Sequence, residues 1–237
     1  MSFTLSKSAV NTYLKCPREF KYQYKDRKPV KKNLAMQMGN EIHDIAKNFI
    51  LLWQEDDSID ILETLLEFER RYDEDYSEHC RNLAAFFKGK LIDEKYSVFI
   101  AEEKLYSEKY DFVGYADIVL EKDGELTVID YKTGKAKSVH SFIRELSYYR
   151  MIIEDKFPDK KVKYAGILFT EFGEYDDVEF TDEDYSSIHC SKTEYENQLK
   201  LLEEVRKNID LGHFEPKRQA LCKNCNYKGY CDRDGFV

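Results

Sequence analysis

Two acidic residues and a lysine occupy positions from which they could act together on a phosphate. Asp117 lies in the apolar run FVGYADIVL, and Asp130 and Lys132 lie in VIDYK. Residues two apart share a face of a strand, so Asp130 and Lys132 point the same way, and a suitable register brings Asp117 to them. Two carboxylates can hold a hard divalent cation, and an ammonium beside them can orient a water for attack on phosphorus. A surface hairpin with scattered charges fits less well, because both acids interrupt apolar strands.

The segment that carries these residues is predicted to be a β-hairpin. Apolar runs at 112–120 and 126–131 flank a turn at 121–124, whose Asp-Gly pair is typical of two-residue hairpin turns. Further strands are expected near 96–105, 164–170 and 177–180. The spacing of apolar residues predicts a helix from Ser6 with a restart at Pro17, followed by helices at 36–54, 59–76, 82–92, 138–155 and 182–210.

The order of these elements predicts an α/β fold. Helices come first, three consecutive strands follow, and a helix and further strands come next, which indicates a mixed central sheet with a helical cap. We expect a single domain over 1–237. It would comprise a helical part at 1–92, a catalytic α/β core at 93–180, and a long helix with a cysteine-rich tail at 181–237.

Composition supports a folded protein and argues against a membrane protein. The chain has 237 residues, of which 42% are hydrophobic, so it can bury a sizeable core. The N-terminus lacks the pattern of a signal peptide, and no apolar run reaches the roughly 18 residues of a membrane span. We therefore expect a cytoplasmic protein with reduced cysteines.

The net charge of −9 opposes nucleic-acid binding, but the charges are unevenly distributed. Residues 15–32 hold eight Lys or Arg against two acids, whereas residues 54–80 hold eleven acids against two arginines. A basic groove can exist on an acidic protein because a ligand responds to the local field. Solvated helix faces explain the same charges equally well.

Three cysteines lie close together in the tail, namely Cys222, Cys225 and Cys231. This is a spacing typical of metal ligands, and a site of four thiolates needs one more. Cys16, Cys80 and Cys190 are the candidates, with His213 as a weaker one. Cys16 is favoured because it stands in the polar segment KCPREF at the helix restart. Spacing alone does not separate zinc from an iron–sulfur cluster, and base rates favour zinc.

Taken in order, these motifs resemble the PD-(D/E)XK nuclease superfamily, specifically its RecB/AddB-like branch with an iron–sulfur cluster. The CRISPR-adaptation nucleases of the Cas-four type belong beside that branch. The opening LSKSAVNTYLKCPREFKYQY is similar to that of the branch and includes Cys16, and GNEIHDIAKNF carries its helical histidine at His43. GYADIVL contains the first acid, Asp117. VIDYKTGK contains the (D/E)XK pair, Asp130 and Lys132.

The resemblance extends to the second half of the chain, with two departures. ELSYYR stands where the branch has a Gln-Leu-x-x-Tyr motif and places Tyr149 at the tyrosine, and CKNCNYKGYC is similar to its three-cysteine tail. Ala116 replaces the proline of the nominal motif. Glu145 replaces the glutamine, and a carboxylate there would either add a metal ligand or repel a DNA phosphate, so its role stays open.

The resemblance implies a metal site, a catalytic lysine and a cluster. Mg²⁺ or Mn²⁺ would be bound by Asp117, Asp130, His43 and the Tyr131 carbonyl, and the imidazole suits Mn²⁺. Lys132 would orient or deprotonate the attacking water. Tyr149 would fix the metal site or contact a phosphate, with core packing as the alternative. A 4Fe-4S cluster, or zinc in its place, would be held by four residues: Cys16, Cys222, Cys225 and Cys231.

The implied function is that of a metal-dependent DNA nuclease. A RecB-like exonuclease acting on single-stranded DNA ends is expected, with a helicase or a CRISPR-adaptation protein as a possible partner. The alternative is a DNA-binding or adaptor subunit of a repair or spacer-acquisition complex with little nuclease activity of its own. An intact set of two acids and a lysine argues against that alternative, because a pure scaffold has no need for all three.

Overall fold

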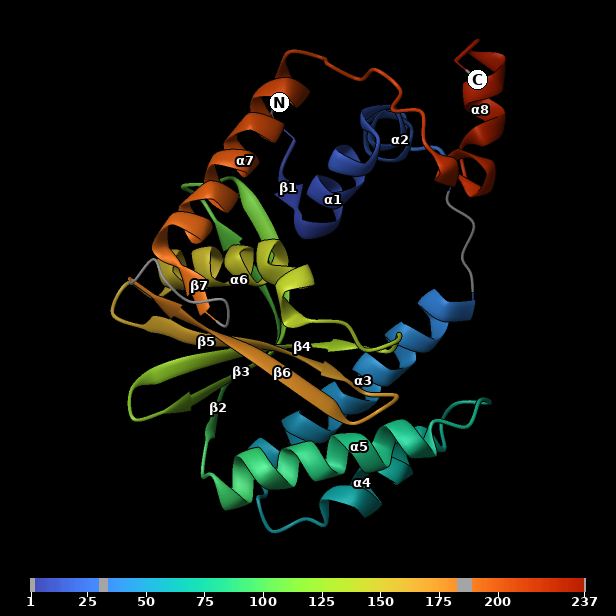
Figure 1. The fold of residues 1–237 in the computed structure, drawn as a ribbon. Coiled ribbons are helices and arrows are strands. Elements are labelled where there is room, and N and C mark those ends of the chain that lie inside the picture. The colour runs from blue at the N-terminus through green and yellow to red at the C-terminus, as the bar shows by residue number, and fades with distance from the viewer. Residues whose placement is uncertain (1–2, 30–33, 183–188, 237) are drawn as a thin grey trace.

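The computed structural model describes residues 3–29, 34–182 and 189–236, and these form an α/β fold around one mixed sheet (Figure 1). The strands β2 and β1 both pair with β3, and β4, β5, β6 and β7 follow in that order. The pairs β1/β3, β4/β5 and β6/β7 are parallel, and the others are antiparallel. The strands are β1 (Leu5–Ser6), β2 (Ser97–Ser107), β3 (Phe112–Lys122), β4 (Glu125–Lys132), β5 (Lys161–Phe169), β6 (Glu174–Thr181) and β7 (His189–Ser191). The predicted α/β fold with a mixed central sheet is confirmed.

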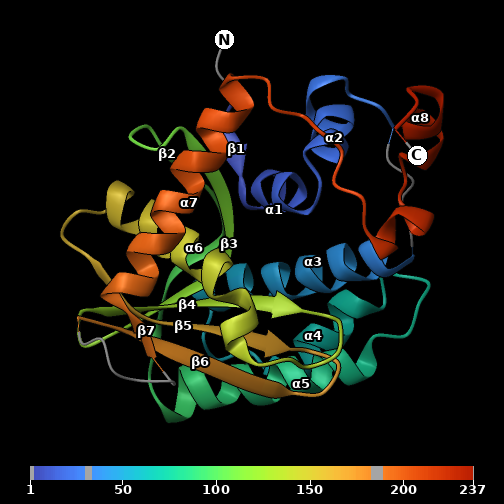
Figure 2. The ribbon, with the colours of Figure 1, turned by 45° about the horizontal axis from the view of Figure 1, so that its top comes forward.

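Helices cover both faces of the sheet (Figures 1 and 2). One core lies between the sheet and α3 (Leu34–Glu55), α4 (Ile61–Glu69) and α5 (Ser77–Phe87). The other lies between the sheet and α1 (Lys7–Lys15), α6 (Ile143–Lys156) and α7 (Lys192–Asp210). On β4, Val128 belongs to the second core, whereas Ile129 and Tyr131 belong to the first. The alternation of the strand therefore turns Asp130 and Lys132 toward α1 and α6.

The predicted hairpin is present and fixes the register of its two strands. Asp123 and Gly124 both have positive φ angles, 54° and 83°, as a type I′ turn requires. Ile118 pairs with Ile129, and beyond this pair β3 and β4 separate, while β4 remains paired with β5 as far as Lys132. The pairing of β2 occupies one edge of β3, so β1 must add at the other, at 112–113. A gap in the pairing of that edge is left at 114–117.

Four predicted helix boundaries were wrong. The helix expected at 138–155 starts at Ile143, after a 3₁₀ turn at Val139–Phe142. The other three differ because a local polar contact ends or starts a helix. The helix expected at 59–76 ends at Glu69, whose Oε1 accepts a hydrogen bond from the backbone N–H of Tyr76 at 3.0 Å. The helix expected at 82–92 therefore starts earlier, at Ser77, and continues as a π-helical turn at Lys88–Asp93. The helix expected from 182 starts at Lys192, because Ser191 caps it.

The last of these errors also misplaced Cys190. It lies in strand β7 and not at the start of a helix. Residues 183–188 of the predicted helix lie outside the described residues, as do 30–33 of the basic segment.

The two ends of the chain pack against each other. Ser6 caps α1 as predicted, accepting from the Ala9 N–H, and Pro17 opens the short helix α2 (Pro17–Phe20). Tyr22 donates a hydrogen bond to Asp234, 2.5 Å away, beside α8 (Lys228–Arg233). The N-terminal helices and the cysteine-rich tail thus form one unit at the end of the molecule where both termini lie.

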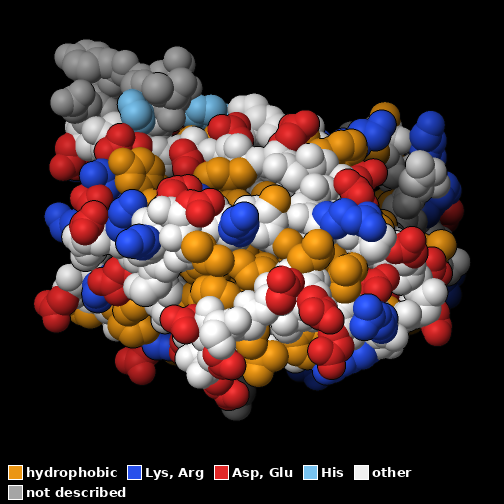
Figure 3. All heavy atoms as spheres, turned by 90° about the horizontal axis from the view of Figure 1, so that it is seen from below, with side chains coloured by type: hydrophobic (Ala, Val, Ile, Leu, Met, Phe, Trp, Pro, Cys, Tyr) orange, Lys and Arg blue, Asp and Glu red, His pale blue; other side chains and the backbone are white. Residues whose placement is uncertain are grey.

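The side formed by α4 and α5 carries acidic and apolar side chains at its surface (Figure 3). It contains most of the acidic segment 54–80. No helix among the described residues is long and apolar enough to cross a membrane.

Gly166 of β5 provides a test of the sheet beside β4. A Cβ added there would lie 2.6–2.8 Å from ring atoms of Tyr175 on β6. We expect Gly166→Ala to lower the free energy of unfolding by about 1–3 kcal/mol, because the ring must move within a packed face. Gly89→Ala is the matched control, since a Cβ there meets nothing within 4 Å. Urea denaturation checks both, and a Gly166→Ala protein as stable as wild type would contradict the packing.

Candidate active site

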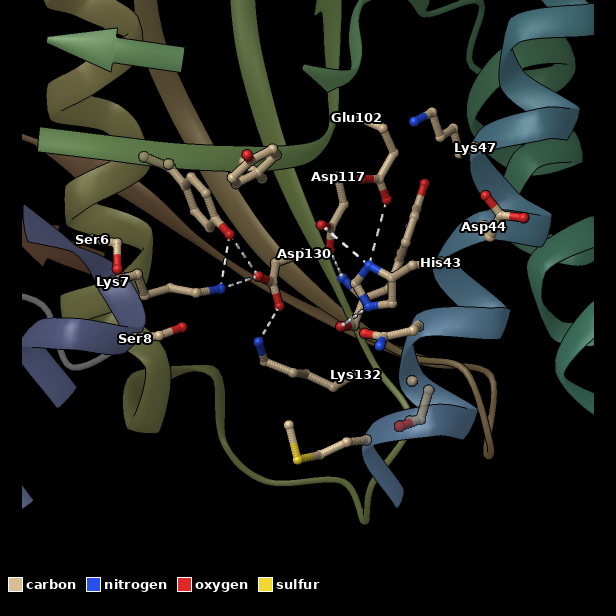
Figure 4. A pocket seen from close by; sticks show the side chains of 18 of the residues that line it. Ser6, Lys7, Ser8, His43, Asp44, Lys47, Glu102, Asp117, Asp130 and Lys132 are labelled. Carbon is tan, nitrogen blue, oxygen red and sulfur yellow. Dashed lines mark hydrogen bonds and ion pairs between the residues drawn. The ribbon is translucent and has the colours of Figure 1, made fainter. Parts of the chain in front are cut away.

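A cavity of about 870 Å³ opens where β3 and β4 separate (Figure 4). Its lining comes from α1, α3, α6 and strands β1 to β4. Six of the residues predicted from the sequence line it together: His43, Asp117, Asp130, Tyr131, Lys132 and Tyr149. Glu145 lies behind them and contacts Lys132.

Three carboxylates form a row across neighbouring strands of this cavity. Glu102 stands between Ala101 and Glu103, whose partners on β3 are Ile118 and Ala116, so it lies across from Asp117. Asp130 follows the residue of β4 that pairs with Ile118. Asp117 and Asp130 are only 7% and 2% exposed. Like charges so close together and so buried require cations around them.

One group of cation-binding atoms is already assembled in this row. Ligand atoms of His43, Glu102 and Asp117 all lie within 4.8 Å of one another. The His43 Nδ1 is 3.3 Å from Asp117 Oδ1 and 3.4 Å from Glu102 Oε1. Apart from this ion pair with His43, the buried Glu102 Oε1 has no hydrogen-bond partner among the described residues. Two carboxylates and an imidazole are a set of ligands that suits Mg²⁺ or Mn²⁺, and Glu102 Oε1 is placed to bind such an ion.

The charge of His43 responds to the same carboxylates. Burial alone would lower the pKa of His43, but Asp117 and Glu102 outweigh it and raise that pKa to about 10. His43 Nε2 lies 3.1 Å from the Tyr131 carbonyl oxygen. Without a metal ion, an imidazolium therefore supplies the positive charge between the two acids.

Asp130 is held by lysines and stands outside this compact group. Its Oδ1 accepts from Lys7 Nζ at 2.8 Å and from Tyr149 Oη at 3.0 Å, and its Oδ2 forms an ion pair with Lys132. Burial alone would raise the pKa of Asp130, but the two ammonium groups lower it below its usual range. Asp130 is therefore ionised and oriented before any metal binds.

Backbone contacts hold the ends of these strands in place. Asp117 Oδ2 accepts from the Tyr131 N–H at 2.7 Å, so a side chain replaces the strand pairing lost at the split. The carbonyl of Lys132 accepts from the Thr170 N–H at 2.9 Å, and the Thr170 hydroxyl contacts His79 Nδ1 of α5 at 2.9 Å. Helix α5 thus supports the strand end that carries Lys132.

Glu102 and Lys7 were missed in the sequence. Glu102 has a positive φ of 46° within a strand, a strained backbone conformation of the kind that clusters at functional sites. Its position opposite Asp117 follows from the short turn between β2 and β3, and counting outward from that turn would have found it. Lys7 has no such signal, because α1 and β4 are far apart in the sequence.

The four predicted cysteines surround one hollow where the chain ends meet. Its volume is about 30 Å³, and the cysteines that line it are Cys16, Cys222, Cys225 and Cys231. Cys80 and Cys190 are fully buried in the two cores, and neither lines the hollow. His213 does not line it either, and its Nδ1 contacts Asn208.

The mixed sheet and its acid–lysine cavity define an α/β protein of the nuclease type. A family model described as the PD-(D/E)XK nuclease superfamily matches residues 4–232, and the chain belongs to this superfamily. The fold is similar to that of a solved protein from Eubacterium rectale named a "putative exonuclease", at 12% identity and a TM-score of 0.57 over 94% of this chain and 87% of that one. At this identity the likeness shows the fold alone. No curated protein matches the sequence.

The raised pKa of His43 predicts that metal binding depends on pH. A metal ion binds neutral imidazole, so it must displace the proton that His43 holds below about pH 10. We expect Mn²⁺ affinity to rise by as much as about tenfold per pH unit from about pH 6.5 to 8.5. Calorimetric titrations in buffers of different ionisation enthalpy count the released proton. His43→Gln should flatten this slope, and equal slopes in the two proteins would contradict the assignment.

Proposed function

We propose that this protein is a Mg²⁺- or Mn²⁺-dependent deoxyribonuclease, a RecB-like exonuclease that acts on single-stranded DNA ends and carries a structural 4Fe-4S cluster. The observation that carries the proposal is the buried row of carboxylates with Lys132 beside it in one open cavity. Superfamily membership supports the nuclease. The preference for single-stranded ends comes from the resemblance to the RecB/AddB-like branch.

The residues of the cavity have separate tasks in hydrolysis. His43, Glu102 and Asp117 would hold the cation, with Asp130 and the Tyr131 carbonyl beside them. When bound, the cation supplies Lewis-acid polarisation of the phosphate and a lower pKa for water. Lys132 orients the water and stabilises negative charge on the phosphate. The water oxygen bonds to phosphorus, the bond from phosphorus to the sugar oxygen breaks, and the proton of the water ends on that oxygen.

The hollow between the cysteines supports a cluster over a single zinc ion. A tetrahedral zinc site, with Zn–S bonds of about 2.3 Å, brings its sulfurs to about 3.8 Å from one another. No three of the four sulfurs lie within 4.8 Å of one another.

Backbone N–H groups are directed at these sulfurs. Lys217 donates to Cys16 Sγ at 3.4 Å, and Tyr227 donates to Cys225 Sγ at 3.5 Å. Hydrogen bonds to sulfur stabilise the thiolates that ligate a cluster. Cys16 and Lys217 are 201 residues apart, so a cluster here would cross-link the two ends of the chain.

Cleavage of end-labelled DNA tests the nuclease. We expect Mn²⁺-dependent degradation of single-stranded DNA from its ends, reduced at least about 100-fold in Asp117→Asn and Lys132→Ala because each removes a charge at the reacting phosphate. Asp57→Asn, at an exposed position outside the cavity, is the matched control. Activity that survives both site variants would refute the assignment. DNA binding without cutting by wild type would favour the adaptor alternative.

Metal analysis of the purified protein tests the cluster separately. We expect a brown protein containing iron and sulfide, and the loss of both in Cys225→Ser. Cys80→Ala, which removes a thiol buried in a core away from the hollow, should keep them. A colourless wild-type protein with one equivalent of zinc would overturn the cluster and leave the nuclease proposal intact.

A further inference from the structure

Lys7 reaches the active-site cavity from α1 and contacts Asp130 (Figure 4). It also contacts Glu145, the second carboxylate beside Lys132. Its Nζ lies 2.8 Å from Asp130 Oδ1 and 3.3 Å from Glu145 Oε2. Lys132 forms an ion pair with the other oxygen of Asp130 and lies 3.3 Å from the same oxygen of Glu145. Two ammonium groups and two carboxylates therefore form a closed ring without net charge.

Helix geometry alone does not explain a lysine at this position. Lys7 is the first residue of α1, directly after the N-cap Ser6, and the helix dipole disfavours a cation there by about 0.3–1 kcal/mol. Its side chain is nevertheless only 23% exposed and ends among carboxylates. The charges of the cavity, and not the helix, account for this lysine.

The same face of α1 holds both oxygens of Glu145. Asn11, one turn after Lys7, donates to Glu145 Oε1 at 3.0 Å, while Lys7 contacts Oε2. Arg144 in turn donates to Asn11 Oδ1 at 3.1 Å. The Glu145 carboxylate is thus fixed at a position where the RecB/AddB-like branch that the sequence resembles has a glutamine.

We propose that Lys7 is a positioning residue for the nuclease reaction, one that occupies Asp130 Oδ1 and neutralises Glu145 so that Lys132 is free to turn toward water and phosphate. The inference rests on the proposed function. Without Lys7, two carboxylates share Lys132 as their only ammonium in the ring and hold it away from the substrate. If the charge of Glu145 is also removed, Lys132 has a single carboxylate partner, Asp130, and it can again turn toward the substrate.

The numbers of positive and negative groups in the ring determine which variants should be compared. We expect Lys7→Met to lower kcat for single-stranded DNA cleavage by about 10- to 100-fold, because Lys132 is then held by two carboxylates and outer-shell partners of an active site usually affect activity by this much. Adding Glu145→Gln should restore kcat to within about threefold of Glu145→Gln alone, as expected for coupled neighbours. Mn²⁺ affinity of Lys7→Met should be no weaker than that of wild type, because the site is one charge more negative. A merely structural role would weaken Mn²⁺ binding together with kcat and would not be rescued.

A surface ion pair between β4 and β5 provides the matched control. Lys163 and Glu125 contact each other at 2.9 Å outside the cavity, so Lys163→Met and Glu125→Gln should have small, additive effects. A fully active Lys7→Met, or a double variant as impaired as Lys7→Met, would overturn the inference. If Lys7→Met alone fails to fold, the double variant is expected to fold, and its failure would count equally against the inference.

The outcome separates this inference from the proposed function. A wild-type protein that cleaves no DNA refutes the nuclease. The role of Lys7 is then judged by the Mn²⁺ titrations and by the free energy of unfolding, which should recover when Glu145→Gln is added to Lys7→Met. Independent effects of the two substitutions on stability would overturn it.

Discussion

The active site depends on holding three carboxylates side by side in a partly buried cavity. Glu102, Asp117 and Asp130 occupy neighbouring strands at one level of the sheet, where mutual repulsion and burial both favour protonation. Cations from three elements offset this: His43 of α3 between the first two acids, Lys132 of β4 and Lys7 of α1 on the third. The position of each of these elements is therefore a requirement of the electrostatics as well as of the fold.

The topology creates the space in which these charges meet. Strands β3 and β4 separate beyond Ile118 and Ile129. The same edge of β3 is next paired at Val113, where β1 lies beside it. Helix α1 starts at that edge with Lys7, runs for nine residues or about 13 Å to Lys15, and has Cys16 as its C-cap. One short helix thus joins the acid row to the cysteine hollow. A ligand bound to Cys16 would hold the C-terminal end of α1 in place, and Lys7 lies at the other end of this helix.

The sequence correctly predicted those turns and helix ends that depend on the residues at that point of the chain. The Asp123-Gly124 turn, the Ser6 cap and the Pro17 restart were all correct, because each depends on the conformational preference of one or two residues. The helix boundaries near 70 and 190 were predicted wrongly. There the side chains of Glu69 and Ser191 accept hydrogen bonds from nearby backbone N–H groups where a helix ends or begins. Such contacts compete with helix continuation without disturbing the apolar periodicity on which the prediction was based.

Prediction of the site from the sequence was more limited than prediction of the fold. A motif gives the spacing of residues along one strand, but it does not give the charged residues on neighbouring strands. Asp117, Asp130 and Lys132 could be found from alternation alone, whereas Glu102 required the register of a second hairpin and a left-handed residue within a strand. Glu145 was ambiguous in the sequence because its charge was considered alone. In the structure it has a partner of opposite charge, Lys7, 138 positions earlier in the chain. The charge of Glu145 is thereby neutralised by a residue of the opening segment whose role its spacing did not indicate, so the balance of charge within the cavity, more than any single position, determines what this site can do.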